Sequence, residues 1–108
     1  MKKKVYLSFP IGKRDIEERR AFSEKRVMYL REMQGYEVVN PLDNGLPVDD
    51  NWRNHMRADY KLMLDCDAVF FCKGWQSSMG CQNEHNVAIS SGLEVIYETS
   101  HWSPNDED

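Results

Sequence analysis

Short apolar runs and longer segments with helical spacing of apolar residues follow one another along the chain. This pattern predicts short strands that alternate with longer helices. Four apolar runs have the length of buried strands: 4–8, 36–39, 68–72 and 93–97. Three longer segments have the three- and four-residue spacing of helices: 15–34, 50–64 and 79–91. Strands that alternate with helices predict parallel β-α-β units with right-handed crossovers.

Turn residues mark the element boundaries. Gly35 and Gly92 are suited to end the first and third helices, and Asp49 or Asp50 is expected to cap the second. Residues 42–49 contain several turn-forming residues and are expected to form a loop.

The fold class that follows is α/β. We expect a small flavodoxin- or Rossmann-like three-layer sandwich with a mostly parallel sheet of four or five strands in the order 2-1-3-4. Residues 1–98 are expected to form one domain, and 99–108 an acidic C-terminal tail. This strand order places a switch point between strands one and three, where ligands bind in such sheets. The loops after those strands, 8–12 and 74–80, therefore predict a pocket.

Composition limits the classes of function that the chain can have. The chain has 108 residues, a net charge of −4 and a pI of about 5.3, which argues against a nucleic-acid polymer as partner. Its early basic residues are interpreted mostly as solvated surface: Lys2, Lys3, Lys4, Lys13, Arg14, Arg19 and Arg20. Lys13 and Arg14 are retained as candidates because they follow the exit of the first strand. We expect no membrane span, no signal peptide and a cytoplasmic location.

The cysteines and histidines predict neither a metal nor a cofactor. Three cysteines without C-x-x-C spacing are typical of reduced thiols in the cytoplasm, and the three histidines form no ligand pattern with them. The Gly/Ser-rich turn before the third helix is more informative. Ser78, Gly80 and Glu84 place a hydroxyl and backbone N–H groups at the helix start and a carboxylate one turn further in. Such a helix N-terminus binds phosphate well, and Ser78 is a candidate cap.

Two carboxylates interrupt apolar stripes. Glu84 shares a helix face with small residues such as Cys81 and Ala88, and Asp59 shares one with Trp52 and other apolar residues. An acid in such a place is costly unless it is paired, hydrogen-bonded or facing a cavity. Each acid alone is equally consistent with the edge of a stripe, where it reaches water or an arginine. Two of them beside one predicted pocket favour a functional role.

The aromatic residues and His85 leave alternatives open. Core packing is the first expectation for Trp52. Trp75 is suited to stack on a base, to contact another subunit or to remain partly exposed. Trp102, in the tail, is expected at an interface, and His85 is expected at the surface because it points about 100° away from Glu84 on the helix.

Several short motifs in order carry a family resemblance over about 4–98. They are Val5-Tyr6-Leu7-Ser8-x-Pro10-Ile11, Gly35-Tyr36-Glu37-Val38-Val39-Asn40-Pro41, Trp52 with Met56-Arg57-x-Asp59, Cys66-Asp67-Ala68-Val69, Gly74-Trp75-x-x-Ser78-x-Gly80-x-x-x-Glu84 and Ala88-x-x-x-Gly92-x-x-Val95-Ile96. The chain resembles the nucleoside 2-deoxyribosyltransferase superfamily. It is most similar to short, often phage-borne members annotated only as a domain of unknown function, and is similar to 2'-deoxynucleoside 5'-phosphate N-hydrolases.

The resemblance implies N-glycosidic bond chemistry on a nucleoside or nucleoside 5'-monophosphate, with no cofactor, in a homo-oligomer (dimer or tetramer). By match to the motifs, Glu84 is the nucleophile, Asp59 the acid that protonates the departing base or helps to hold the substrate, and Tyr6 the residue that orients the nucleophile. Residues expected to bind substrate are Ser8, Phe9, Ile11, Arg14, Asn40, Trp75, Ser78 and Gly80.

Two departures from the family pattern keep other functions open. Relatives usually carry Gly where this chain has Phe9, and the nucleotide hydrolases use a hydroxyl where it has Pro10. Both changes weaken phosphate binding by this loop, and Phe9 is suited instead to stack on a base or fill the pocket. Hydrolysis and base transfer both remain possible outcomes, and so do a non-catalytic nucleotide-binding module and an interaction protein that uses Trp75 and Trp102.

Overall fold

The computed structural model describes residues 2–12 and 14–99, so the expectations for Lys13 and Trp102 lie outside the described part. A four-stranded sheet consists of β1 (Lys4–Ser8), β2 (Glu37–Val39), β3 (Ala68–Phe71) and β4 (Glu94–Tyr97). The helices are α1 (Ile16–Glu32), α2 (Trp52–Leu64) and α3 (Met79–Ser90). Two short 3-10 helices that the sequence did not predict are η1 (Pro41–Asp43) and η2 (Trp75–Ser77).

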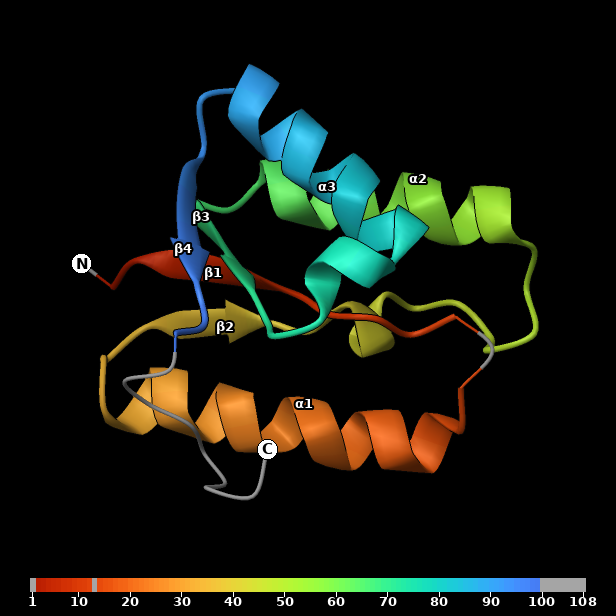
Figure 1. Ribbon diagram of the computed structural model, residues 1–108, viewed down its shortest axis with the longest axis horizontal. Helices are drawn as coiled ribbons and strands as arrows, with labels where there is room; N and C mark the ends of the chain where they lie inside the picture. The colour runs from red at the N-terminus through yellow and green to blue at the C-terminus, as the bar shows by residue number, and fades with distance from the viewer. Residues whose placement is uncertain (1, 13, 100–108) are drawn as a thin grey trace.

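The sheet confirms the predicted topology. All pairings are parallel and the order is β2-β1-β3-β4. Helix α1 covers one face of the sheet, while α2 and α3 cover the other, which gives three layers (Figure 1). The carboxyl ends of β1 and β3 are neighbours at the point where the chain reverses its strand order, as the sequence predicted.

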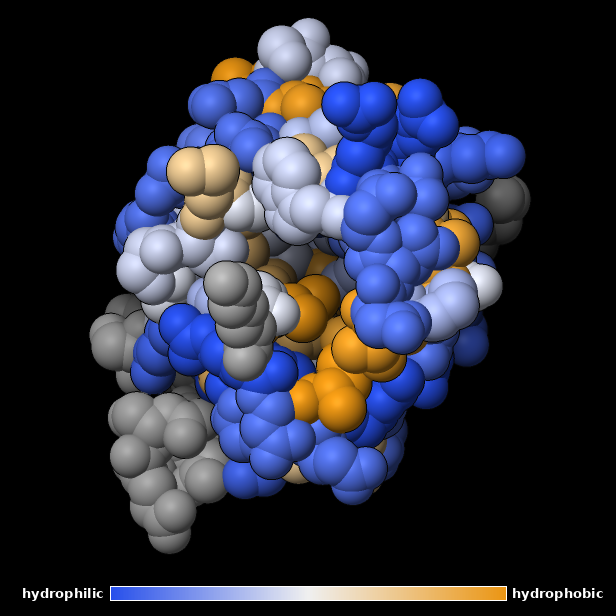
Figure 2. All heavy atoms as spheres, turned by 90° about the vertical axis from the view of Figure 1, so that its right-hand side faces the viewer, coloured by the Kyte–Doolittle hydropathy of each residue, from blue (hydrophilic) through white to orange (hydrophobic). Residues whose placement is uncertain are grey.

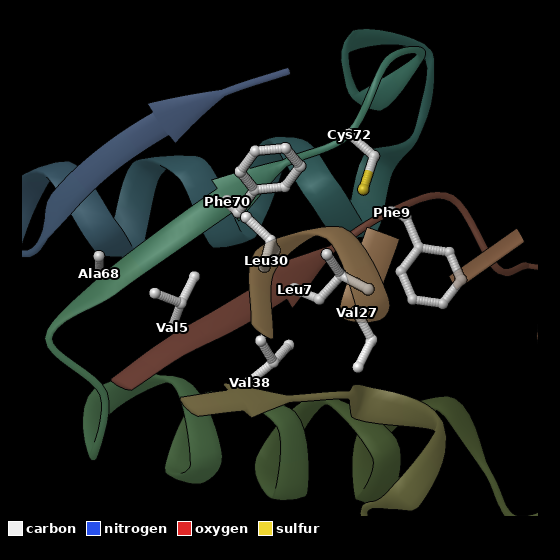
Figure 3. Close-up of a cluster of buried hydrophobic side chains, with 9 residues drawn as sticks. All are labelled: Val5, Leu7, Phe9, Val27, Leu30, Val38, Ala68, Phe70 and Cys72. Carbon is white, nitrogen blue, oxygen red and sulfur yellow. The ribbon is translucent and has the colours of Figure 1, made fainter. Parts of the chain in front are cut away.

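Alternation along β1 directs its side chains into two separate cores. Val5 and Leu7 pack toward α1 in a cluster that continues through Val27 and Phe70 (Figure 3). Tyr6, between Val5 and Leu7, belongs to the opposite cluster under α2 and α3. Since side chains two residues apart share a face of a strand, this alternation places the polar groups of Tyr6 and Ser8 on the α3 side.

Polar caps set the helix boundaries. Asp15 caps α1 by accepting a hydrogen bond from the Glu17 backbone N–H at 2.9 Å. The expectation of Asp49 or Asp50 as the cap of α2 was wrong, because Asn51 accepts from the Asn54 backbone N–H at 2.9 Å. Asp50 instead accepts from the Asn51 backbone N–H and the Asn54 side chain, so it supports the cap from outside.

Two arginines of α1 are buried, which corrects the interpretation of Arg19 as solvated surface. Arg19 is 6% exposed and donates to the Pro10 carbonyl at 3.0 Å, so it anchors the loop after β1. Arg26 is 1% exposed and donates through two nitrogens to the carboxylate of Glu98 at 3.2 Å each. Arg19 also donates to both oxygens of the adjacent Glu18 carboxylate, at 2.7 and 2.5 Å, so each buried guanidinium is paired with a carboxylate. The partner of Arg26 is 72 residues away, and helical periodicity alone does not reveal it. No helix in the described part of the chain is long and apolar enough to cross a membrane.

Candidate active site

A cavity of about 420 Å³ opens at the carboxyl ends of β1 and β3, where the sequence predicted a pocket. Figure 2 shows this side of the molecule hollowed, with hydrophobic side chains gathered in the hollow. The loops after β1 and β2 and the first turns of α2 and α3 line it. Its volume is within the range that small-molecule sites occupy.

Glu84 lies at the inner end of the cavity on the second turn of α3. It is 8% exposed, and each of its carboxylate oxygens accepts one hydrogen bond. The Ser8 hydroxyl donates to Oε1 at 2.7 Å and the Tyr6 hydroxyl donates to Oε2 at 2.7 Å. Two residues on one face of β1 therefore hold both oxygens of a single acid in a fixed orientation.

The buried setting of Glu84 changes its acidity. Burial raises its pKa to about 7, the hydrogen bonds from Ser8 and Tyr6 act in the opposite direction, and the charge of Asp59 adds to the rise. Burial also raises the pKa of Tyr6 well above its ordinary value, so this side chain remains a hydroxyl donor at neutral pH. Glu84 is consequently an acid that exchanges its proton near neutrality.

Asp59, from α2, lines the same cavity and is half-buried. Burial raises its pKa, while the Asn44 side chain, which donates to Oδ1 at 2.9 Å, and His55 both act to lower it. The structure thus brings together the two carboxylates that interrupt the apolar stripes. The charge of Asp59 also raises the pKa of Glu84, as a smaller influence than burial and the two hydrogen bonds.

The N-terminus of α3 provides polar groups at the cavity wall. Ser78 caps the helix by accepting from the Cys81 backbone N–H at 3.3 Å, as the sequence suggested, and Gly80 follows it in the lining. Gly74 has a φ of +91°, a conformation that favours glycine, and it starts the turn into η2. Arg14 lines the cavity from the loop after β1 and is exposed.

Other candidate residues take different positions. Phe9 and Ile11 line the cavity, although Phe9 is only 3% exposed and stacks on Phe22 with ring centroids 5.7 Å apart. Ser8 is not part of the cavity lining, and it contributes to the site through its hydrogen bond to Glu84. Asn40 lies outside the cavity lining, where its side chain donates to the Ser23 hydroxyl at 2.9 Å and accepts from the Leu42 backbone N–H.

The structure places Trp75 outside the cavity and corrects two expectations for aromatic neighbours. Trp75 stacks on the imidazole of His85 at a centroid distance of 4.4 Å, and both contact Phe71. His85 is therefore partly buried in an aromatic cluster rather than a simple surface residue. Trp52 is 59% exposed and lines the cavity, so the expectation of core packing was wrong: it lies at the first position of α2, where the helix projects beyond the sheet.

Among the polar residues of the lining, sequence reasoning missed Asn44 and His55. Asn44 lies in the loop expected over 42–49, and His55 was considered only as a metal ligand. Their positions depend on a long-range contact between the loop after β2 and α2, which no local periodicity encodes. The described residues contain no group of three or more His, Cys, Asp or Glu side chains arranged to hold a metal ion.

Comparison with protein families shows the family to which the chain belongs. The family model described as Domain of unknown function (DUF4406) matches residues 3–97. The chain belongs to this family. A comparison of this DUF4406 chain with curated proteins gave no match.

Two solved structures share the fold of the DUF4406 chain. A conserved protein from Enterococcus faecalis V583 is 18% identical with a TM-score of 0.66, and the alignment covers 100% of this chain and 70% of that one. The CMP N-glycosidase BcmB from Clostridium botulinum is 21% identical with a TM-score of 0.58, and the alignment covers 94% and 75% of the two chains. Both likenesses support the three-layer α/β fold described above.

Proposed function

We propose that the protein cleaves the N-glycosidic bond of a nucleoside or nucleoside 5'-monophosphate through a glycosyl-enzyme ester on Glu84. The observation that carries this proposal is the pair of carboxylates in one cavity. Glu84 is held at both oxygens by Tyr6 and Ser8, and Asp59 faces the same space with a raised pKa. The shared fold with an enzyme named as a CMP N-glycosidase supports the same reaction class.

In the first half of the reaction, Glu84 acts as the nucleophile and Asp59 as the general acid. The Glu84 carboxylate attacks the anomeric carbon, the carbon–nitrogen bond breaks, and its electron pair moves to the base. Asp59 gives its proton to that base, so neutral base leaves and an ester joins the sugar to Glu84. Two displacements through a covalent intermediate replace one difficult step.

The second half restores both acids. Water attacks the anomeric carbon of the ester, loses its proton to the Asp59 carboxylate and releases Glu84 as a carboxylate. A second base in place of water gives transfer instead of hydrolysis, with the same proton going to Asp59. The bonds formed and broken balance in either case, so the acceptor that enters the cavity decides between the two reactions.

A 5'-phosphate has a suitable position at the N-terminus of α3. The N-terminal residues of α3, its cap Ser78 and the cation of Arg14 all belong to the cavity lining. Apolar side chains from the loop after β2 and from α2 line another part of the wall and are suited to contact a base: Leu42, Leu46, Val48, Trp52 and Met56.

The test is an assay for free base over a panel of nucleosides and 5'-monophosphates, with and without a second base. Glu84→Gln should lower base release by at least 10³-fold, because a covalent nucleophile is lost. The matched control is Glu32→Gln, which removes an exposed carboxylate of α1 and should leave release unchanged. Full activity in Glu84→Gln would contradict the proposal.

A non-catalytic nucleotide-binding module is the second candidate, and Phe9 and Pro10 favour it. Phe9 is packed into the core beside the cavity, and Pro10 has no backbone N–H to offer a phosphate. Saturable binding of a nucleotide, seen as a ligand-dependent rise in melting temperature without base release, would support this candidate over the enzyme.

A further inference from the structure

In the loop after β2, the side-chain amide of Asn44 contacts two titratable side chains of α2. The side-chain nitrogen of Asn44 lies 2.9 Å from Oδ1 of Asp59 and 3.0 Å from Nδ1 of His55. All three residues line the cavity. The amide therefore lies between the proposed acid and a histidine one helical turn away from it.

Neighbouring contacts fix the orientation of this amide. The oxygen of Asn44 accepts from the Leu46 backbone N–H at 3.0 Å, so its NH₂ group must face α2. Nε2 of His55 lies 3.1 Å from the Pro47 carbonyl, which can only accept. Nε2 therefore carries the proton of the neutral ring, and Nδ1 is left to accept from Asn44.

We propose that Asn44 is a positioning residue, which His55 holds in place, and that it directs the acidic proton of Asp59 to Oδ2. An NH₂ group has two hydrogens, and here one is given to Asp59 and the other to neutral His55. An N–H donor at Oδ1 favours the proton on the other oxygen of the carboxyl group. The proton that the departing base needs thus has one defined location.

Nδ1 of neutral His55 accepts the hydrogen of the NH₂ group that Asp59 does not use, so the Asn44 amide is held between two acceptors. The inference rests on the function proposed above, because the position of this proton matters only if Asp59 acts as an acid.

Other ionisable groups act on Asp59 from every element around it, and each must be considered in a pH experiment. They are His55 and Tyr60 on α2, Glu84 on α3 and Tyr6 on β1. Arg14, in the loop after β1, lines the same cavity. The Asn44 variants described next leave all of these in place. A change in the titration of Asp59 then reports the loss of the amide.

The deciding experiment follows the Asp59 side-chain carboxyl carbon and the His55 ring nitrogens by NMR over a pH series, without ligand. In Asn44→Ala the pKa of Asp59 should rise, because a donor to the carboxylate is removed. The matched control is Asn54→Ala, which removes a similar amide–carboxylate bond on α2, from Asn54 to Asp50 at 2.8 Å, and should leave Asp59 unchanged. Neutral His55 should be protonated at Nε2.

Two results overturn the inference: an unchanged titration of Asp59 in Asn44→Ala, or a neutral His55 protonated mainly at Nδ1. Asn44→Ser, whose hydroxyl still accepts the Leu46 N–H in the turn, is measured in the same way if Asn44→Ala does not fold. Because NMR needs no turnover, it decides the inference even if the wild-type protein releases no base.

Kinetics provide the second readout where base release occurs. Asn44→Ala should lower kcat more than it changes KM and move the basic limb of the pH profile to higher pH, since Asp59 keeps its proton longer. An unchanged profile would overturn the inference while leaving the proposed function intact. Absence of release in the wild type would instead contradict the proposed function alone.

Discussion

At the scale of one residue, the buried carboxylate of Glu84 lowers the free energy of unfolding at neutral and higher pH. Its pKa is about 7 in the folded protein against an ordinary value of 4.5. Between these values the unfolded chain loses a proton that the folded chain keeps, so the free energy of unfolding falls as the pH rises through this range. Below about pH 4.5 both states are protonated and the cost disappears.

Glu84→Gln should therefore stabilise the protein at pH 8 by up to about 3 kcal/mol and change its stability little at pH 4. The uncharged amide removes the cost of a buried carboxylate, and the hydroxyls of Tyr6 and Ser8 can rotate to meet it. Urea unfolding of both proteins at the two pH values measures the effect. Equal destabilisation at both values would show that the hydrogen bonds outweigh the buried charge.

At the scale of elements, a buried ion pair joins α1 to Glu98, the residue that follows β4. Arg26 and Glu98 are nearly inaccessible, and the Phe22 ring lies 3.7 Å beneath the guanidinium. Glu98 also accepts from the backbone N–H of Lys73 at 3.0 Å, at the start of the turn that leads to α3. The pair therefore ties both helical layers to one end of the sheet.

Arg26→Leu should cost about 3–5 kcal/mol of unfolding free energy, because it leaves the Glu98 carboxylate buried and unpaired. Adding Glu98→Gln should recover part of that loss, since the amide still accepts from Lys73. Chemical denaturation of both single variants and the double variant gives the coupling between the two sites. Additive losses would show that the two charges do not stabilise one another.

Sequence pattern also predicted the elements themselves well. Period and turn residues located each strand and helix to within two residues, because β1 and β3 are continuous apolar runs and Gly35 and Gly92 follow helix ends. The same reasoning brought Glu84 and Asp59 to one pocket. It failed for Arg19, Asn44 and Trp52, whose surroundings are set by contacts between elements distant in the sequence.

At the scale of the whole molecule, several apolar side chains that line the cavity are also exposed to solvent, and we call them the rim. Val48, Trp52 and Met79 line the cavity and are 69%, 59% and 69% exposed. Apolar groups gathered around an opening are typical of surfaces that a ligand or another chain covers. The family resemblance implies a homo-oligomer, which is consistent with such a rim.

We expect sedimentation velocity to give a dimer or tetramer of the 12.7 kDa chain at micromolar concentration. Burial of apolar surface between the copies supplies the driving force. Trp52→Glu places a charge on the rim and should shift the equilibrium toward monomer, whereas Met33→Glu, at an equally exposed apolar site at the end of α1, should not. A monomeric wild type would contradict the expectation.

The buried carboxylate of Glu84 has a consequence for the history of this fold. Glutamate and glutamine codons differ by a single base, so one mutation converts the proposed nucleophile into the amide that we predict to be more stable in this pocket. We expect lineages without selection for the proposed reaction to drift toward that change, while the fold and the ligand cavity persist. We therefore expect a distant relative with glutamate at this position to keep the chemistry, and one with glutamine to bind only.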